Sequence, residues 1–391
     1  MKIIKLQFYR SKFIKHVREN IYHLVTPRFI EGGYKLIDVF SKLMILLISF
    51  LISSCQTKQP QDIKTAFYHW KTDFNISNIE KQYLDSLKTK KLYLRFFDID
   101  WDETTHFAKP LANISNFKNI DTTFEIIPTI YITNKTFTQL KDNQLDTLSK
   151  LVFEKIVKNT SHSHRDKRDK EGDIFNEIQI DCDWTESTRA RFFSFLKYLK
   201  SISNKQISAT IRLHQVKFFE KTGVPPVDKG MLMAYNMGNL DDVKTENSIL
   251  NIEILKLYLK NLDKYPLKLD IALPLFSWGV VMRDGEVVKL INNLSFQDFF
   301  KIDDVRHNSA LNVRDNIAHV SKNCYFKGYY LYKDDEIRLE ETPLSILQKT
   351  ADLLAQHIDN QQLTVSFFHL DSLIIQRYRY EDLQNIVYRF H

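Results

Sequence analysis

The sequence predicts a (β/α)₈ barrel, in which eight parallel strands alternate with helices. Short runs rich in aromatic and β-branched residues recur along the chain, and segments with apolar residues at helical spacing separate them. Runs such as LYLRFF and LDIALPLF are almost continuously hydrophobic, as expected for strands of a parallel sheet that is covered on both faces. The eight predicted strands lie at residues 66–70, 92–100, 125–133, 177–184, 207–215, 231–237, 269–278 and 363–371.

Residues 1–54 are expected to be a leader outside the fold. Residues 43–54, LMILLISFLISS, are uncharged and mostly apolar, and they end at Cys55. This stretch is too short to span a bilayer as a helix and has the length of a signal-peptide core. The long basic segment before it is interpreted as an upstream mis-assigned start or, alternatively, as a basic amphipathic arm. Residues 55–62 are predicted to be a tether, and residues 63–391 a single barrel domain.

Two β-hairpins are predicted as insertions before the last strand. Asp284 and Gly285 separate the apolar pairs 280–281 and 287–288, and an Asp-Gly dipeptide supports the positive φ angles of a tight hairpin turn. A second ribbon is expected at residues 328–340. An open doubly wound sheet is the alternative to the barrel. The nine glycines form no G-x-G-x-x-G and no P-loop motif, so nucleotide binding has no support.

The distribution of charge and cysteine excludes several classes of partner. The formal net charge is +7, but residues beyond 54 hold 46 basic against 45 acidic side chains, so no nucleic-acid partner is expected. Three cysteines do not make a disulfide framework. There is no H-E-x-x-H or C-x-x-C spacing, and we therefore expect no metal site and no cofactor.

Polar and aromatic residues gather at the predicted C-terminal ends of the strands, where barrels of this kind carry their functional groups. Carboxylates among Trp and Tyr suit a carbohydrate, because flat rings cover the apolar face of a sugar while polar groups bond its hydroxyls. The candidate catalytic residues are Asp98, Asp100, Asp181 and Asp183. The candidate substrate-binding residues are Trp70, Trp101, Tyr131, Trp184, Arg212, His214, Gln215, Tyr235, Asn236, Trp278, His369 and Asp371.

Asp181 and Asp183 form the sharpest local pattern. Residues two apart on a strand face the same side, so both carboxylates are expected to face the barrel interior and Cys182 to face the helices. Two carboxylates in one poorly solvated site raise each other's pKa, which is how one of them becomes a proton donor. The alternative for Arg212 is a structural ion pair with Asp181 or Asp183.

Two short motifs resemble known families. The junction Ile52-Ser53-Ser54-Cys55 resembles the bacterial lipobox, which implies lipidation of Cys55 and anchoring to a membrane of the cell envelope, on the periplasmic or cell-surface side. The segment EIQIDCDWT resembles the fourth-strand motif D-G-x-D-x-D-x-E of chitinase-like glycoside hydrolases, with Asp181 and Asp183 on its second and third acids. Its catalytic Glu falls on Thr185 and its first Asp on Ile178.

The order QIDCDWT, SATIRLHQ, PPVDKGMLMAYNMG, LDIALPLFSWGVV and FHLDS resembles an uncharacterised family of exported barrel lipoproteins from Bacteroidetes-type bacteria. This resemblance implies a glycoside-hydrolase-like barrel and carries no activity. The first functional hypothesis is a lipid-anchored glycoside hydrolase that uses strand-end aspartates and acts on a glycan or oligosaccharide. The alternatives are a non-catalytic glycan-binding lipoprotein and an envelope protein that binds other proteins through its insertions.

Overall fold

The computed structural model describes residues 62–117, 124–161, 175–300 and 310–391. Residues 60–391 form one compact unit. The predicted leader, the lipidation site Cys55 and the predicted tether up to residue 61 lie outside the described residues. Among the residues that are described, no helix is both long and apolar enough to cross a membrane.

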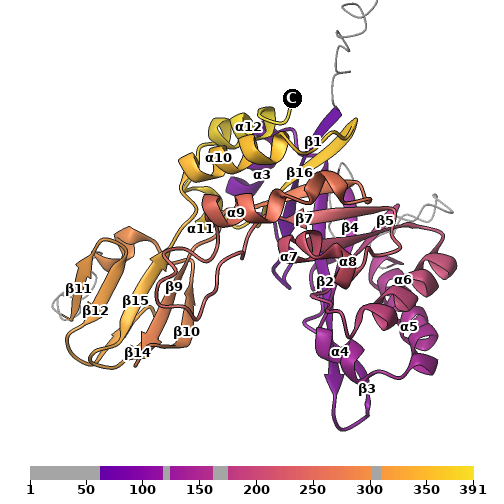
Figure 1. Ribbon diagram of the computed structural model, residues 1–391, viewed down its shortest axis with the longest axis horizontal. Coiled ribbons are helices and arrows are strands. Elements are labelled where there is room, and N and C mark those ends of the chain that lie inside the picture. The colour runs from indigo at the N-terminus through magenta and orange to yellow at the C-terminus, as the bar shows by residue number, and fades with distance from the viewer. Residues whose placement is uncertain (1–61, 118–123, 162–174, 301–309) are drawn as a thin grey trace, which may run out of the picture. The chain divides into compact units, whose positions relative to one another are not determined.

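The described chain forms a closed barrel of eight parallel strands, as the sequence predicts (Figure 1). The strand order is β1-β16-β8-β7-β6-β5-β4-β2, and pairing of β1 with β2 closes the circle. These strands are β1 (Asp62–His69), β2 (Lys91–Asp102), β4 (Glu125–Ile132), β5 (Glu177–Asp181), β6 (Gln206–Arg212), β7 (Lys229–Met233), β8 (Leu269–Pro274) and β16 (Gln362–Phe368). A short antiparallel strand, β3 (Phe107–Leu111), extends the sheet beside the end of β2.

Helices with one apolar face surround the barrel. The α-helices are α3 (Asn78–Ser86), α4 (Asn134–Gln139), α5 (Leu145–Ser161), α6 (Arg189–Ser203), α7 (Leu213–Lys217), α8 (Phe219–Thr222), α9 (Ile252–Leu259), α10 (Leu344–Ala355), α11 (Ser372–Ile375) and α12 (Tyr380–Tyr388). Local sequence sets their ends: Ser77 and Glu80 form a reciprocal capping box on α3, and Asn251 accepts two backbone N–H groups at the start of α9. Single-turn 3₁₀ segments are η2 (Asp142–Gln144), η3 (Leu262–Lys264) and η4 (Phe296–Phe299).

The barrel interior is filled by side chains. The Tyr68 hydroxyl of β1 donates to Gln179 Oε1 of β5 (2.6 Å), and the Tyr68 ring stacks on Tyr93 of β2 at 4.8 Å. Gly230 of β7 allows close packing, because a Cβ there would lie 2.6 Å from the Leu269 side chain and 2.7 Å from that of Ile211. The barrel is therefore a packed core that opens only toward its two ends.

An insertion between β8 and α10 forms a second hydrophobic core. Its five-stranded antiparallel sheet has the order β10-β9-β15-β12-β11 within the described part of the chain. The insertion strands are β9 (Trp278–Arg283), β10 (Glu286–Asn292), β11 (Leu311–Arg314), β12 (Ile317–Val320), β13 (Cys324–Phe326), β14 (Tyr329–Leu331) and β15 (Glu336–Glu340). The predicted hairpin around Asp284 and Gly285 is confirmed, since β9 pairs with β10 and both turn residues have positive φ.

Several boundaries differ from the sequence prediction, and three of the differences matter most. The ribbon expected at residues 328–340 is wrong: β14 pairs with β13, while β15 pairs with β9 and β12. The fifth run ends as a strand at Arg212, and residues 213–217 form α7 instead. The seventh run splits, because β8 ends at Pro274 and Trp278 begins β9.

Candidate functional site at the barrel mouth

A continuous strip of aromatic rings lies at the C-terminal end of the barrel. Phe368, the last residue of β16, is its centre, and its ring centroid lies 5.5 Å from Trp70, 5.5 Å from Tyr235 and 5.9 Å from Phe276. Trp278 continues the strip at 5.2 Å from Phe276. Trp70, Phe368 and Trp278 are only half-buried, so this end of the barrel presents aromatic surface to solvent.

Asp183 and Arg212 form an ion pair beside this strip. Arg212 Nε donates to Asp183 Oδ1, and its Nη2 lies 3.2 Å from Oδ2. Burial alone would lower the pKa of Arg212, but the carboxylates of Asp181 and Asp183 outweigh it and raise that pKa. The alternative reading of Arg212 as an ion-pair partner is thus confirmed for Asp183.

Asp181 is buried directly below the pair. It accepts a hydrogen bond from Thr210 Oγ1 (2.6 Å) and is 4% exposed. Burial, with a smaller contribution from Asp183, raises the pKa of Asp181. Tyr131 is aligned with Asp181 across β4 and β5, and burial together with these two carboxylates raises the pKa of Tyr131 to about 12.

A β-bulge places a second ion pair in the same layer. Between Arg95 and Phe97 the register of β2 against β4 shifts, so Arg95 and Asp98, three apart, lie on one face. Arg95 Nε donates to Asp98 Oδ1 (2.8 Å), and its guanidinium lies 5.6 Å from the centre of a Trp70 ring. Asp100 acts locally instead, accepting from Thr133 Oγ1 (2.6 Å) and from the N–H of Trp101 (2.9 Å).

Glu340 of β15 fixes Trp278 from behind. The Trp278 Nε1 donates to Glu340 Oε2 (2.8 Å), which also accepts from the backbone N–H of Ser248 (2.9 Å). The other oxygen, Oε1, accepts from Arg338 Nε (2.8 Å). Both Glu340 and Arg338 are almost completely buried, so one charged pair connects the insertion, the loop after β7 and the mouth.

Two predicted binding residues belong to the protein core. Trp184 is completely buried; it stacks on Phe192 at 5.0 Å and its Nε1 donates to the carbonyl of Thr222 (3.0 Å). Gln215 is also buried and bonds the N–H of Arg212 and the carbonyl of Trp184. The expectation that all four tryptophans share one rim is therefore wrong, because β5 ends at Asp181 and the chain turns Trp184 toward α6.

The remaining predicted residues have varied surroundings. Asp371 pairs with Lys71 (2.9 Å) and caps α11 through the N–H of Leu373 (2.8 Å), which is a structural role. His369 is half-buried, and burial lowers its pKa. The other three lie on segments that follow strands or extend beyond the barrel: Trp101 on the β2–β3 hairpin, His214 exposed on α7, and Asn236 exposed after β7.

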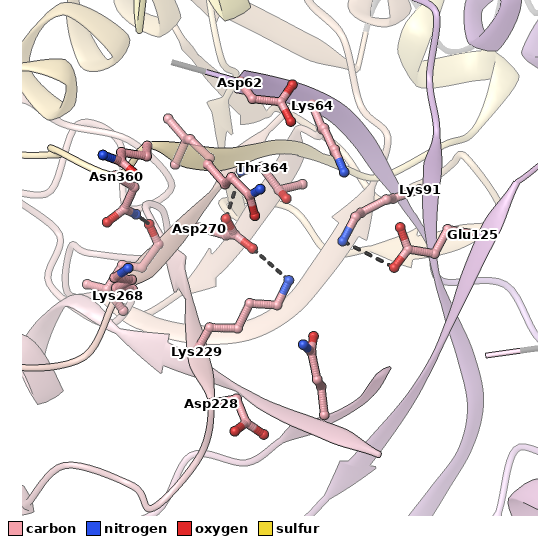
Figure 2. A pocket seen from close by; sticks show the side chains of 15 residues that line it. Asp62, Lys64, Lys91, Glu125, Asp228, Lys229, Lys268, Asp270, Asn360 and Thr364 are labelled. Atoms are coloured by element: carbon pink, nitrogen blue, oxygen red, sulfur yellow. Dashed lines mark hydrogen bonds and ion pairs between the residues drawn. The ribbon is translucent and has the colours of Figure 1, made fainter. Parts of the chain in front are cut away.

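A polar cavity of about 570 Å³ lies at the opposite, N-terminal end of the barrel (Figure 2). Lys229 bridges Glu177 (2.9 Å) and Asp270 (3.1 Å), and Lys91 bridges Glu125 (3.3 Å) and Glu177 (3.8 Å). These charges satisfy one another where the strands begin. We therefore assign this end to barrel closure, and the catalytic end of such folds is the other one.

Metal and thiol chemistry find no support in the described residues. No group of three or more His, Cys, Asp or Glu side chains in that part of the chain is arranged to hold a metal ion. Cys182, the residue that follows β5, is fully buried in the barrel core, and burial raises the pKa of its thiol well above the ordinary value.

Comparison with solved structures supports the fold. The spore cortex-lytic enzyme SleL of Bacillus megaterium QM B1551 matches with a TM-score of 0.51 and 12% identity, over 84% of this chain and 74% of that chain. The C-terminal domain of a putative chitinase from Desulfitobacterium hafniense DCB-2 matches with a TM-score of 0.51 and 11% identity, over 85% and 100%. The chain thus has the same barrel fold as these two proteins. No protein-family description and no curated protein matches it.

Sequence reasoning missed several residues of the mouth. Arg95, Phe368 and Phe276 were read only as parts of hydrophobic strands, and Glu340 as part of a ribbon. A signal for Arg95 was present, since a charged residue inside the run KLYLRFF needs a partner in a buried strand. For Glu340 the local pattern shows only Arg338, two residues away, while Trp278 and Ser248 lie 62 and 92 residues away in sequence.

Proposed function

We propose that the barrel mouth binds a glycan and holds it without cleaving it. The observation that carries this proposal is the state of the mouth carboxylates. The half-exposed Asp183 is tied to Arg212, Asp98 is tied to Arg95, and the unpaired Asp181 is buried below them. The mouth therefore combines aromatic surface with fixed donors and acceptors.

These groups match the two kinds of surface that a sugar ring presents. The half-buried faces of Trp70, Phe368 and Trp278 can cover the C–H face of a pyranose. The ion pairs of Arg212 and Arg95 offer charge-assisted hydrogen bonds to hydroxyls at fixed positions. The likeness to a putative chitinase and a spore cortex-lytic enzyme adds support at the level of the fold.

The absence of cleavage follows from the place of the missing acid. Glycosidases need an exposed carboxylic acid beside the scissile bond, together with a second carboxylate or an equivalent group. Where the chitinase-like motif has its Glu, this chain has Thr185, whose hydroxyl bonds Ser187 at 2.9 Å at the start of the following turn. The hydroxyl of Thr185 is too weak an acid to act as the proton donor that cleavage needs.

A glycoside hydrolase is the second candidate, and one observation favours it. The pKa of Asp181 is raised, and a carboxyl group that stays protonated can act as a proton donor. In this reading a ligand would displace the Arg212 side chain and expose Asp181 to the mouth.

One experiment separates the two candidates. The full chain is purified in detergent and mixed with N-acetylglucosamine oligomers, peptidoglycan fragments and a broad panel of other glycans, and both binding and release of reducing ends are measured. Binding without release, weakened at least tenfold by Trp70→Ala, supports the proposal. Release that disappears in Asp181→Asn overturns it in favour of a hydrolase. If the wild type shows no binding and no release of reducing ends with any of these glycans, both candidates are excluded.

The proposal also covers the location of the protein in the cell. Residues 43–54 and the lipobox-like junction support export and lipidation at Cys55, which would anchor the barrel to a membrane of the bacterial envelope. Cells expressing the protein are labelled with a radioactive or clickable fatty acid and fractionated. Label on the wild type, with loss of both label and membrane association in Cys55→Ala, is expected. An unlabelled, soluble wild-type chain would contradict the proposal.

A further inference from the structure

The geometry points to a second glycan-binding surface, a strip of tyrosines on the β13–β14 hairpin of the insertion. This tyrosine strip consists of Tyr325, Tyr330 and Tyr332. It rests on the proposed function in one respect only, namely that the ligand of the protein is a glycan. The mouth aromatics pack into the barrel core, whereas the hairpin packs into the second core, so the two surfaces are separate.

The hairpin exposes these rings because successive side chains of its strands point to opposite faces. On one face, Phe326 and Leu331 are buried in the insertion core, and on the other Tyr325 pairs directly with Tyr330. Tyr332 follows two residues after Tyr330. The three side chains are 62%, 42% and 49% exposed, although aromatic residues of this size normally bury most of their surface.

The exposed rings hold one another in fixed positions. The ring centroids of Tyr325 and Tyr330 are 5.0 Å apart with planes at 68°, and those of Tyr330 and Tyr332 are 5.0 Å apart at 87°. Arg283 lies over the Tyr332 ring at 4.2 Å and is held by two hydrogen bonds to the buried Asp335 (2.7 and 2.9 Å). Such preorganisation lowers the entropy that a ligand must offset on binding.

The size and chemistry of the strip favour a glycan over a protein or a membrane. About half of three tyrosines amounts to roughly 300 Å², whereas a stable protein partner covers about 800 Å². A membrane surface is disfavoured because binding to one scales with the apolar area that enters it, and β13 and β14 expose tyrosines but no large aliphatic side chain.

The orientation of the rings defines the ligand further. Neighbouring planes are steeply inclined, so the strip forms steps and not one flat platform. A flat crystalline polysaccharide surface cannot contact all three rings. A single soluble chain of β-linked pyranoses, whose rings carry C–H faces on alternating sides, can follow the steps. The inferred ligand is therefore a free polysaccharide strand, with the tyrosine strip and the mouth acting as two contacts for long chains.

The test compares long and short ligands on the full chain. Soluble glycol chitin and other soluble polysaccharides are the long probes, and trisaccharides of the same sugars are the short ones. The variant is Tyr325→Ala/Tyr330→Ala/Tyr332→Ala. The matched control is Tyr198→Ala, which removes a tyrosine of α6 that is 45% exposed. Thermal unfolding verifies that each variant is folded, and Tyr325→Ala alone replaces the triple variant if that one is not.

We expect the triple variant to lose about tenfold or more in affinity for the polysaccharide that the wild type binds, with unchanged trisaccharide affinity and no effect of Tyr198→Ala. Unchanged polysaccharide affinity in the triple variant, with binding still lost in Trp70→Ala, overturns this inference and leaves the proposed function intact. Loss in the triple variant with none in Trp70→Ala supports the tyrosine strip and overturns the proposed mouth. No glycan binding by the wild type overturns both.

Discussion

Replacing Glu340 with Gln should be strongly destabilising although the two side chains have the same shape. Both carboxylate oxygens of Glu340 accept hydrogen bonds: Oε1 from Arg338 Nε, and Oε2 from Trp278 Nε1 and from the N–H and hydroxyl of Ser248. Every partner is a donor. Whichever way the amide of Gln is turned, its NH₂ group faces a donor, and the guanidinium of Arg338 loses its buried counter-charge.

The structure allows a magnitude to be worked out. Arg338 is 2% exposed, so water cannot replace the lost carboxylate. Removing one partner of a buried ion pair typically costs about 3–5 kcal/mol, and one lost hydrogen bond to a charged group alone costs about 1.5–3 kcal/mol. We therefore expect Glu340→Gln to lower the free energy of unfolding by about 3–5 kcal/mol, a large share of the stability of a typical domain.

Urea denaturation followed by circular dichroism and by tryptophan fluorescence measures this change. Fluorescence is informative because Trp278 itself loses an acceptor. Glu336→Gln is the matched control on the same strand: Glu336 is partly exposed and, within the described part of the chain, pairs with His319, so a change within about 0.5 kcal/mol is expected. A loss below 1 kcal/mol in Glu340→Gln would refute the reasoning that this carboxylate organises the junction.

Three further predictions concern the barrel. Burial lowers the pKa of His69 to about 4, and neither ring nitrogen has a partner among the described residues. Below pH 6.5 the unfolded chain therefore binds a proton on His69 that the folded chain does not bind. The free energy of unfolding should fall by about 3 kcal/mol between pH 6.5 and pH 4. Thermal melts at a series of pH values should show a flatter pH dependence in His69→Leu, and an unchanged pH dependence would contradict the prediction. Trp184→Ala should lower the free energy of unfolding by about 3–5 kcal/mol in urea denaturation, because it leaves a cavity in the core. Trp70→Ala, at a half-buried position, should cost much less stability and should weaken glycan binding. Equal stability losses in the two variants would argue that the two tryptophans are not placed differently. Asp183→Asn should change stability by less than about 1 kcal/mol, since Asp183 is itself half-exposed and the mostly buried Arg212 keeps an amide oxygen as acceptor and the nearby charge of Asp181. A larger loss by denaturation would show that the ion pair is a structural requirement of the mouth.

The fold was accessible from the sequence because the signal for parallel strands is local. Each of the eight runs overlaps the strand that the structure has at that place, and the Asp-Gly turn lies where its dipeptide predicts. The errors occur where the chain changes direction. Residues 213–215 are predicted as the end of a strand but begin α7, and the Gln215 side chain accepts the N–H of Arg212 at the start of this helix.

The candidate site was less accessible, since placement of a side chain at a strand end depends on tertiary contacts. The spacing of Asp181, Asp183 and Arg212 brought three interacting residues to one place, as expected. Alternation alone would place Trp184 on the side of Cys182, toward the helices, where the structure buries it; the expectation of a rim position came only from its place at the end of the predicted strand. The placement of Arg95 beside Asp98 depends on the β-bulge in β2, and no pattern in the run KLYLRFF predicts a bulge.

The two ends of the barrel show why charge pairing has a different meaning at each. At the N-terminal end, Lys229 and Glu177 are paired with side chains that are mostly buried, so separating them would leave charges without water. At the mouth, Asp183 is paired but half-exposed, and a competing hydroxyl can take one of its hydrogen bonds at small cost. Exchange of partners, which a ligand requires, is therefore cheap at the mouth and expensive at the opposite end. This difference supports the proposed glycan site at the mouth over one at the polar cavity.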